Sequence, residues 1–196
     1  MQLDNILKNI KSIVTLSNLE NEGFISILNY KKYKKKEYVF REGNICNFII
    51  YVNSGIFRLF YIHDGEEKII DFFVENNWYT DFESYLTNNS TNFSFQALTD
   101  GDIFILHKED IDRMYEKFPR TERIGRKLVE MALVGVTLKS KMIANIPPEQ
   151  RYLQLLERRP FLLEKLPQHY IASYLNLKPE SLSRIRKRLV ENNKFS

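Results

Sequence analysis

Residues 168–189 read QHYIASYLNLKPESLSRIRKRL, two short helical patterns separated by a turn. Ala172, at the fifth position, has a side chain small enough to let two helices cross closely. Asn176, at the ninth position, stands in the turn, where positive φ is needed and asparagine tolerates it better than most residues. Pro179 stands where a first-turn proline begins a helix. The stretch therefore predicts a helix-turn-helix, whose packing positions are Ile171, Leu175, Leu177, Leu182 and Ile185.

The second helix of this motif has side chains that suit the major groove of DNA. Glu180, Ser181 and Arg184 lie near one face of its amino-terminal half, where a recognition helix meets base edges. Arg184 can donate two hydrogen bonds to a guanine, and Glu180 can accept one from a cytosine amine. Phosphate contacts are expected later in this helix and at the start of the first helix. The predicted DNA-contacting set is Gln168, His169, Glu180, Ser181, Ser183, Arg184, Lys187 and Arg188. The alternative is a structural helical hairpin with a basic exposed side.

Charge is distributed unevenly along the chain. Lys139–Ser196 carries 12 basic and 5 acidic residues, a net charge of +7, whereas the preceding residues sum to −3. A basic tail behind an acidic body indicates a polyanionic partner at the carboxyl-terminal end. The alternative is a solvated basic surface without a partner.

The segment before the motif predicts a long helix from Arg120 to Ala144, ended by Pro147 and Pro148. Its apolar residues repeat at spacings of 4, 3, 4, 3 and 4, which is a heptad seam. The seam consists of Ile124, Leu128, Met131, Gly135, Leu138 and Met142. A second apolar set lies on another face, so the helix needs two neighbours. We expect its own β domain to be one and the same helix of a second subunit to be the other. The alternative is a monomer in which both contacts lie within the chain.

The part of the chain up to about Asp112 reads as strands joined by tight turns, after a short helix around Glu20–Leu28. The clearest hairpin pairs Ile56–Ile62 with Lys68–Phe73 through Asp64-Gly65, a dipeptide that suits a type I′ turn. Three further predicted strands are Phe48–Val52, Phe93–Leu98 and Asp102–His107, and a short helix follows at Glu109–Lys117. Many short strands with regular turns predict a barrel or a jelly roll.

Taken together, these features resemble the cyclic-AMP receptor protein / fumarate-nitrate reduction regulator (CRP/FNR) family of bacterial transcription factors. The matching motifs are Phe40-Arg41-Glu42-Gly43, Ile50-Tyr51-Val52-Asn53-Ser54-Gly55, Arg58, Asp64-Gly65-Glu66 and Pro179-Glu180-Ser181-Leu182-Ser183-Arg184. In this family a glutamate and a following arginine of the recognition helix read bases, which the resemblance assigns to Glu180 and Arg184.

The resemblance implies an α+β chain of three parts. Residues 1–115 form a cyclic-nucleotide-binding-like β-barrel or jelly-roll sensor domain, and residues 116–145 form a dimerisation helix. Residues 146–196 form a winged-helix-type helix-turn-helix domain, whose wing is short or missing because the sequence ends at Asn192–Ser196. The family further implies a cytoplasmic homodimer on palindromic promoter sites, with double-stranded DNA and RNA polymerase as partners.

The sequence departs from the cyclic-nucleotide-binding members of the family, in which an arginine holds the cyclic phosphate. No arginine or lysine lies between Trp78 and Phe95, and an anionic phosphate buried without a positive partner is costly. We therefore predict no response to cyclic AMP. The alternative, a cyclic-nucleotide-responsive regulator, stays open because helix amides can hold phosphate. An effector, if there is one, is unidentified, and its candidate pocket comprises Arg58, Phe72, Trp78, Asp81, Glu83 and Ser84. The aromatic residues of this region fit either a small apolar effector or a filled core.

Other function classes find little support in the sequence. Cys46 is the only cysteine, so an internal disulfide is excluded, and one thiol cannot by itself hold an iron–sulfur cluster or a structural zinc ion. His63 and His107 are the only histidines of the β region, too few to favour haem ligation. A cupin-type metal enzyme is a distant alternative, because such a site needs two or three histidines and His169 belongs to the helix-turn-helix. We predict no enzymatic activity, no metal, no other cofactor, no secretory signal and no membrane span.

Overall fold

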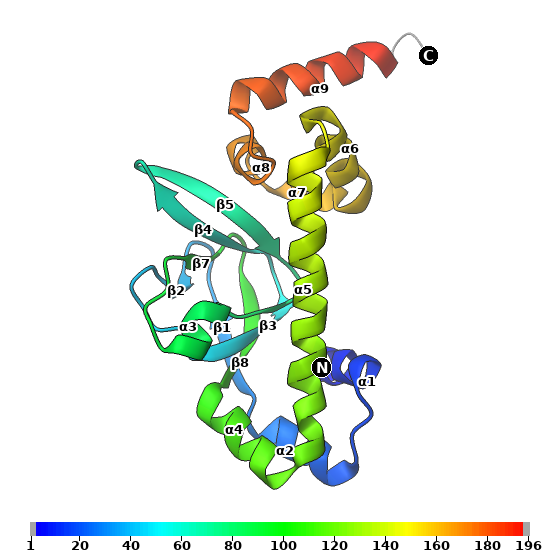
Figure 1. The fold of residues 1–196 in the computed structure, drawn as a ribbon. Helices are drawn as coiled ribbons and strands as arrows, with labels where there is room; N and C mark the ends of the chain where they lie inside the picture. The colour runs from blue at the N-terminus through cyan, green and yellow to red at the C-terminus, as the bar shows by residue number, and fades with distance from the viewer. Residues whose placement is uncertain (1–2, 194–196) are drawn as a thin grey trace. The chain divides into compact units, whose positions relative to one another are not determined.

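A computed structural model describes residues 3–193 of the chain, and Figure 1 shows its helices and strands. The chain divides into two compact units. Unit 1 comprises Met1–Tyr61 and Asp71–Ala132, and unit 2 comprises Ile62–Ile70 and Leu133–Ser196. Residues 194–196, which enter the prediction of a short or missing wing, lie outside the described residues.

Two four-stranded sheets form the β region, a jelly-roll-like arrangement rather than a closed barrel. The first sheet has the order β1 (Asn29–Tyr33), β8 (Gly101–His107), β3 (Phe48–Ser54) and β6 (Trp78–Tyr79). The second sheet has the order β2 (Tyr38–Phe40), β7 (Ser94–Ala97), β4 (Phe57–His63) and β5 (Glu66–Phe73). Neighbouring strands are antiparallel in the pairs β1–β8, β8–β3, β3–β6, β2–β7 and β7–β4.

The turns of the β region lie where the sequence predicts them. Asp64 and Gly65, between β4 and β5, have φ angles of 51° and 75°, which confirms the predicted Asp-Gly hairpin turn. Gly55, between β3 and β4, has a φ of 89° and passes close to the backbone of Gly101. A Cβ atom at Gly55 would lie 2.8 Å from the Cα atom of Gly101, so a side chain has no room there.

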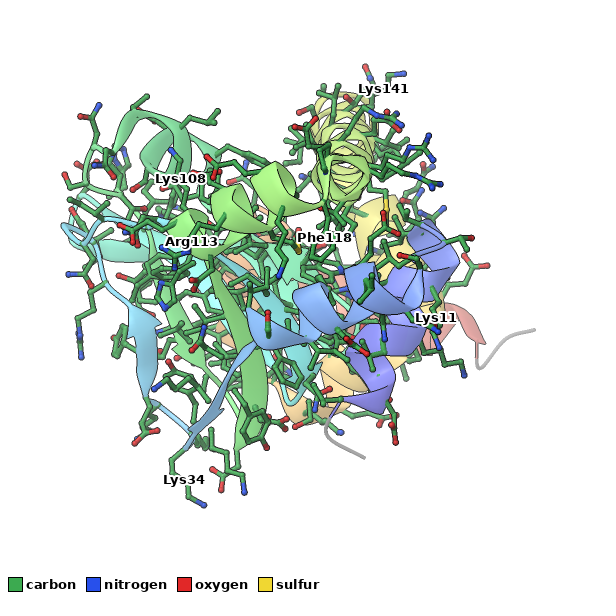
Figure 2. The ribbon with its side chains drawn as sticks, turned by 90° about the horizontal axis from the view of Figure 1, so that it is seen from below. Lys11, Lys34, Lys108, Arg113, Phe118 and Lys141 are labelled. Atoms are coloured by element: carbon green, nitrogen blue, oxygen red, sulfur yellow. The ribbon has the colours of Figure 1, made fainter. Side chains whose placement is uncertain are left out.

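Helices cover the first sheet of unit 1. They are α1 (Asp4–Ile13), α2 (Asn18–Ser26), α4 (Lys108–Lys117) and the first half of α5, and a short helix, α3 (Phe82–Thr87), follows β6. Their apolar side chains form one buried cluster with Tyr51 and Phe104 of the sheet. Phe118, labelled in Figure 2, packs so closely against Gly23 of α2 that a Cβ atom there would lie 2.6 Å from its ring. Neither α1 nor α3 is predicted from the sequence.

The long helix α5 runs from Glu122 to Asn145, after a 3-10 turn at Pro119–Thr121. The predicted span of Arg120–Ala144 is therefore confirmed to within two residues. Four further helices follow in unit 2: α6 (Pro148–Arg158), α7 (Pro160–Lys165), α8 (Gln168–Tyr174) and α9 (Pro179–Asn193). Tyr152, Leu155, Leu162 and Leu166 provide much of their buried apolar surface.

The tip of the β4–β5 hairpin belongs to unit 2, and α8 contacts it. The Ser173 hydroxyl accepts a hydrogen bond from the Ile69 N–H at 2.9 Å and donates one to the Glu67 carbonyl at 3.2 Å. Lys139 of α5 donates to the Ile70 carbonyl and lies 4.8 Å from the centre of the Tyr174 ring. Because β5 is an edge strand of its sheet, these contacts satisfy backbone groups that no further strand pairs.

Candidate functional site

The α8–α9 helix pair has the packing and the turn that the sequence predicts. Ala172 is completely buried, and Leu182, which lies in α9, is almost so. Asn176 has a φ of 54°, which confirms the left-handed residue expected in the turn. The Leu177 N–H then donates to the Ala172 carbonyl at 2.8 Å, which holds the turn against α8. Four of the five predicted apolar positions are buried: Ile171, Leu175, Leu182 and Ile185. The fifth, Leu177, is half-buried.

The polar side of α9 is open to solvent. Glu180, Ser183, Arg184 and Lys187 are exposed, and Ser181 is half-buried. Within unit 2 an open hollow of about 730 Å³ lies between this side of α9 and the start of α6. Ser181, Arg184, Lys187 and Arg188 line the hollow from α9. The structure therefore gathers most of the residues predicted to contact DNA from α9 in one solvent-exposed place.

Arg188 has a partner that is not predicted from the sequence. Its guanidinium Nη2 lies 3.0 Å from Oε2 of Glu149, in the first turn of α6. Lys187 lies at the 4.0 Å limit from Glu191, one turn along the same helix. No sequence signal marks the Glu149–Arg188 pair, because its members are far apart in the chain and belong to different helices.

Gln168 and His169 lie in the first turn of α8 and are exposed. The His169 ring contacts the Tyr170 ring with centroids 4.3 Å apart. Neither residue lines the hollow beside α9. The eight predicted DNA-contacting residues are thus divided between α9 and the start of α8.

The six residues of the candidate effector pocket do not converge. Arg58 is paired in register with Gln96, and its Nε atom donates to Gln96 Oε1 at 2.9 Å. It lies on the opposite face of its sheet from Phe57 and Phe95, because successive side chains of a strand alternate. Trp78 packs against Tyr51 and donates to Asn9 of α1 at 2.8 Å, so it faces the helical layer. Glu83 is exposed, and Phe72 is buried in the core.

Asp81 and Ser84 are buried, and each holds local structure. The Asp81 carboxylate caps α3 by accepting from the N–H groups of Glu83 and Ser84, and it also accepts from the hydroxyl of Thr91. The Ser84 hydroxyl accepts from the Cys46 N–H at 2.8 Å and donates to the Asn89 carbonyl at 2.6 Å. Thr91 is not among the site residues predicted from the sequence, although it lies between Trp78 and Phe95, the segment without arginine or lysine.

Aromatic rings occupy the space between the two sheets. Phe95 of β7 is completely buried, and the rings of Tyr79, Phe57 and Phe40 stack on it with centroids 5.3, 5.5 and 5.8 Å away. Phe73 contacts Tyr79 and Phe95 at 4.9 and 5.4 Å. Burial, with the nearby Asp81 carboxylate, raises the pKa of Tyr79 well above its ordinary value, so its hydroxyl stays protonated. The sequence allowed two interpretations of these aromatic residues, a pocket for a small apolar effector or a filled core, and this stack resembles a filled core.

The predicted heptad seam of α5 is divided between the core and the surface. Ile124 is buried in the cluster of unit 1, and Leu128 packs against that cluster. These two side chains serve the chain's own core, which removes them from the seam available to a second subunit. Met131 and Leu138 are more than half exposed, Gly135 is exposed and Met142 is half-buried. Other apolar side chains exposed along α5 are Val129, Leu133, Val134, Val136 and Ile143.

The described residues contain no group of three or more His, Cys, Asp or Glu side chains able to hold a metal ion. Cys46 is buried, and burial raises the pKa of its thiol, so the thiol form is favoured. Over the same described residues, no helix is both long and apolar enough to cross a bilayer.

Comparisons with known proteins agree with this geometry. The family model of the cyclic nucleotide-binding domain matches residues 30–118. The match shows that this segment is similar to cyclic nucleotide-binding domains. It covers both sheets and ends with α4. A search of curated proteins gives no match for the chain.

Solved structures place the cyclic nucleotide-binding domain within a larger fold. The c-di-GMP-responsive global regulator CLP of Xanthomonas campestris is similar over 90% of this chain and 93% of its own, with a TM-score of 0.70 and 18% identity. FixK2 of Bradyrhizobium japonicum is similar over 85% of this chain and 86% of its own, with a TM-score of 0.68 and 16% identity.

A third similar structure is described as a member of the crp/fnr family. It is a transcriptional regulator of the crp/fnr family from Eubacterium rectale, similar over 90% of this chain and 85% of its own, with a TM-score of 0.70 and 17% identity. The chain thus has the CRP/FNR fold, and the resemblance seen in the sequence is confirmed.

Proposed function

We propose that this chain is a sequence-specific DNA-binding transcription regulator of the CRP/FNR type. The observation that carries the proposal is the α8–α9 pair, whose left-handed turn at Asn176 leaves Glu180, Arg184 and Lys187 exposed along one helix. Arg184 and Glu180 read base edges, as arginine and glutamate do in the major groove. Lys187 meets phosphate, and Gln168 and His169 of α8 contact the backbone of the duplex.

The acting species is a homodimer on a two-fold palindrome. The apolar side chains exposed along α5 supply the surface that a second copy covers, since an isologous interface uses the same patch twice. In this assignment residues 1–115 form the cyclic nucleotide-binding-like domain, 116–145 the dimerisation helix and 146–196 the DNA-binding domain. Its partners are double-stranded DNA, a second copy and RNA polymerase, and the site of action is the cytoplasm.

The proposed regulator does not respond to cyclic AMP. The Asp81 carboxylate is buried beside Thr91 in the segment that lacks lysine and arginine, so a phosphate there would meet a negative charge. The aromatic stack around Phe95 occupies the space between the sheets. The proposed function includes no catalytic activity and no cofactor.

Salt-dependent DNA binding tests the proposal. The affinity of the purified chain for short random-sequence duplexes is measured by fluorescence anisotropy at several salt concentrations. The wild-type chain binds, and Lys187→Ala lowers the slope of log K against log salt by about 0.9, the loss of one phosphate contact. Lys31→Ala, which removes one exposed charge from β1, is the matched control and leaves the slope unchanged. No binding by the wild-type chain, or equal losses in both variants, would contradict the proposal.

A further inference from the structure

The ion pair between Glu149 and Arg188 affects which positive side chains of α9 can bind a phosphate. Arg184 and Arg188 are one turn apart on α9, and both line the hollow of about 730 Å³ beside the start of α6. From charge alone, each would hold a phosphate of the duplex. Their surroundings differ, however, because Arg188 lies 3.0 Å from the Glu149 carboxylate.

The start of α6 disfavours a phosphate next to Arg188. Pro147 and Pro148 have no N–H group, so the first amides that a helix end usually offers to an anion are missing. Glu149 follows them, where the helix dipole favours a carboxylate. Its side chain is 34% exposed, against 60% for Arg188, so the carboxylate is the more enclosed partner. A phosphate that approached Arg188 would meet this negative charge at short range.

We propose that Glu149 is a specificity-determining residue, which keeps Arg188 from binding phosphates of the DNA backbone. The inference rests on the proposed DNA-binding function and concerns how its site is tuned. Phosphate contacts strengthen binding to every sequence alike, whereas base contacts distinguish sequences. By neutralising Arg188, Glu149 lowers the sequence-independent share of the affinity. Glu191, which also lines the hollow, lies 4.0 Å from Lys187, farther than the 3.0 Å between Glu149 and Arg188.

The test is the salt dependence of binding to random-sequence duplexes. Glu149→Gln keeps the size of the side chain and removes its charge. We expect it to steepen the slope of log K against log salt by about 0.9, which is a gain on the order of tenfold in affinity at 0.1 M salt. The double variant Glu149→Gln/Arg188→Ala returns the slope to the wild-type value. Glu157→Gln is the matched control, since Glu157 is an exposed residue of the same helix and does not line the hollow.

The outcomes separate the inference from the function on which it rests. If no variant binds duplex DNA, the proposed function is wrong. If the chain binds DNA but Glu149→Gln behaves like Glu157→Gln, the role of Glu149 is wrong. The same holds if the double variant keeps the steeper slope, or if Arg188→Ala alone flattens the wild-type slope by about 0.9.

Discussion

The hydroxyl of Thr91 donates a hydrogen bond to the carboxylate of Asp81, and both side chains are buried. The same carboxylate caps α3, and the Thr91 hydroxyl also accepts from the Phe93 N–H at 3.0 Å. This hydrogen-bonded pair lies in the segment between Trp78 and Phe95, which contains no arginine or lysine.

Removal of the Thr91 hydroxyl is expected to destabilise this region. Thr91→Val keeps the volume of the side chain but leaves the buried Asp81 carboxylate without one donor, which costs about 1–3 kcal/mol. Urea unfolding at neutral pH measures the loss, and Thr91→Ser, which keeps a hydroxyl, serves as the control. Equal stability of the valine and wild-type chains would show that the hydrogen bond contributes little.

Cyclic AMP is expected to leave the melting temperature of the purified chain unchanged, even at millimolar concentration. A ligand that binds only the folded state raises the melting temperature as its concentration exceeds the dissociation constant. Thermal unfolding followed by fluorescence over a nucleotide series gives the answer. A saturable rise would show that the chain binds cyclic AMP although no arginine or lysine lies between Trp78 and Phe95.

Arg184 is expected to decide which bases are preferred. Arg184→Ala removes a donor pair that reads a guanine, so binding to the preferred site weakens by about 1–3 kcal/mol relative to other sequences. Sequence selection from a random duplex pool, performed with both chains, measures the change. An unchanged preferred sequence in the variant would mean that α9 is not the recognition helix.

A larger side chain at Gly135 is expected to weaken dimerisation without disturbing the fold of the single subunit. A Cβ atom built at Gly135 meets no atom within 4 Å, so a larger side chain fits the single subunit. In a close helix–helix contact the same side chain would hold the two helices apart. We expect Gly135→Leu to raise the dissociation constant of the dimer at least about tenfold by sedimentation, since 1.4 kcal/mol of lost packing suffices. Gly135→Ala is the milder control, and an intact dimer of the leucine variant would count against the seam.

Ionisation of the buried Tyr51 hydroxyl is expected to destabilise the folded chain at high pH. Tyr51 is completely buried, its hydroxyl donates to Asn76 Oδ1 at 2.7 Å, and burial raises its pKa to about 12. A raised pKa means that the folded state favours the protonated hydroxyl. The contribution of this hydroxyl to the free energy of unfolding is therefore complete below pH 10 and is lost as the pH rises toward 12. The stability difference between wild type and Tyr51→Phe is expected to shrink over that interval, by up to roughly 3 kcal/mol. Urea unfolding at several alkaline pH values measures it, and a constant difference would contradict the assignment.

Features that depend on a few neighbouring residues could be predicted from the sequence. The Asp64-Gly65 turn, the left-handed Asn176 and the end of α5 before Pro147 all follow from local backbone preferences. The buried position of Ala172 follows from the same short motif.

Features that depend on tertiary packing could not be predicted in this way. Ile124 fits the heptad seam by spacing, yet it is buried in the core of unit 1, because the start of α5 packs there. The predicted pocket includes both Arg58 and Asp81, but the pleat of β4 turns Arg58 to the face of its sheet opposite Phe57 and Phe95. The Glu149–Arg188 pair joins two helices whose approach no local pattern encodes.

Selection of bound sequences from a random duplex pool is the direct test of sequence-specific recognition by a dimer. The purified chain is incubated with the pool at physiological salt without added ligand, and the retained DNA is sequenced. We expect a two-fold palindrome whose half-site centres lie about one helical turn apart, because a symmetric dimer presents two α9 helices to one face of the duplex. Retention without any consensus, disappearing as salt rises, would contradict sequence-specific recognition and leave only a basic surface that holds phosphates.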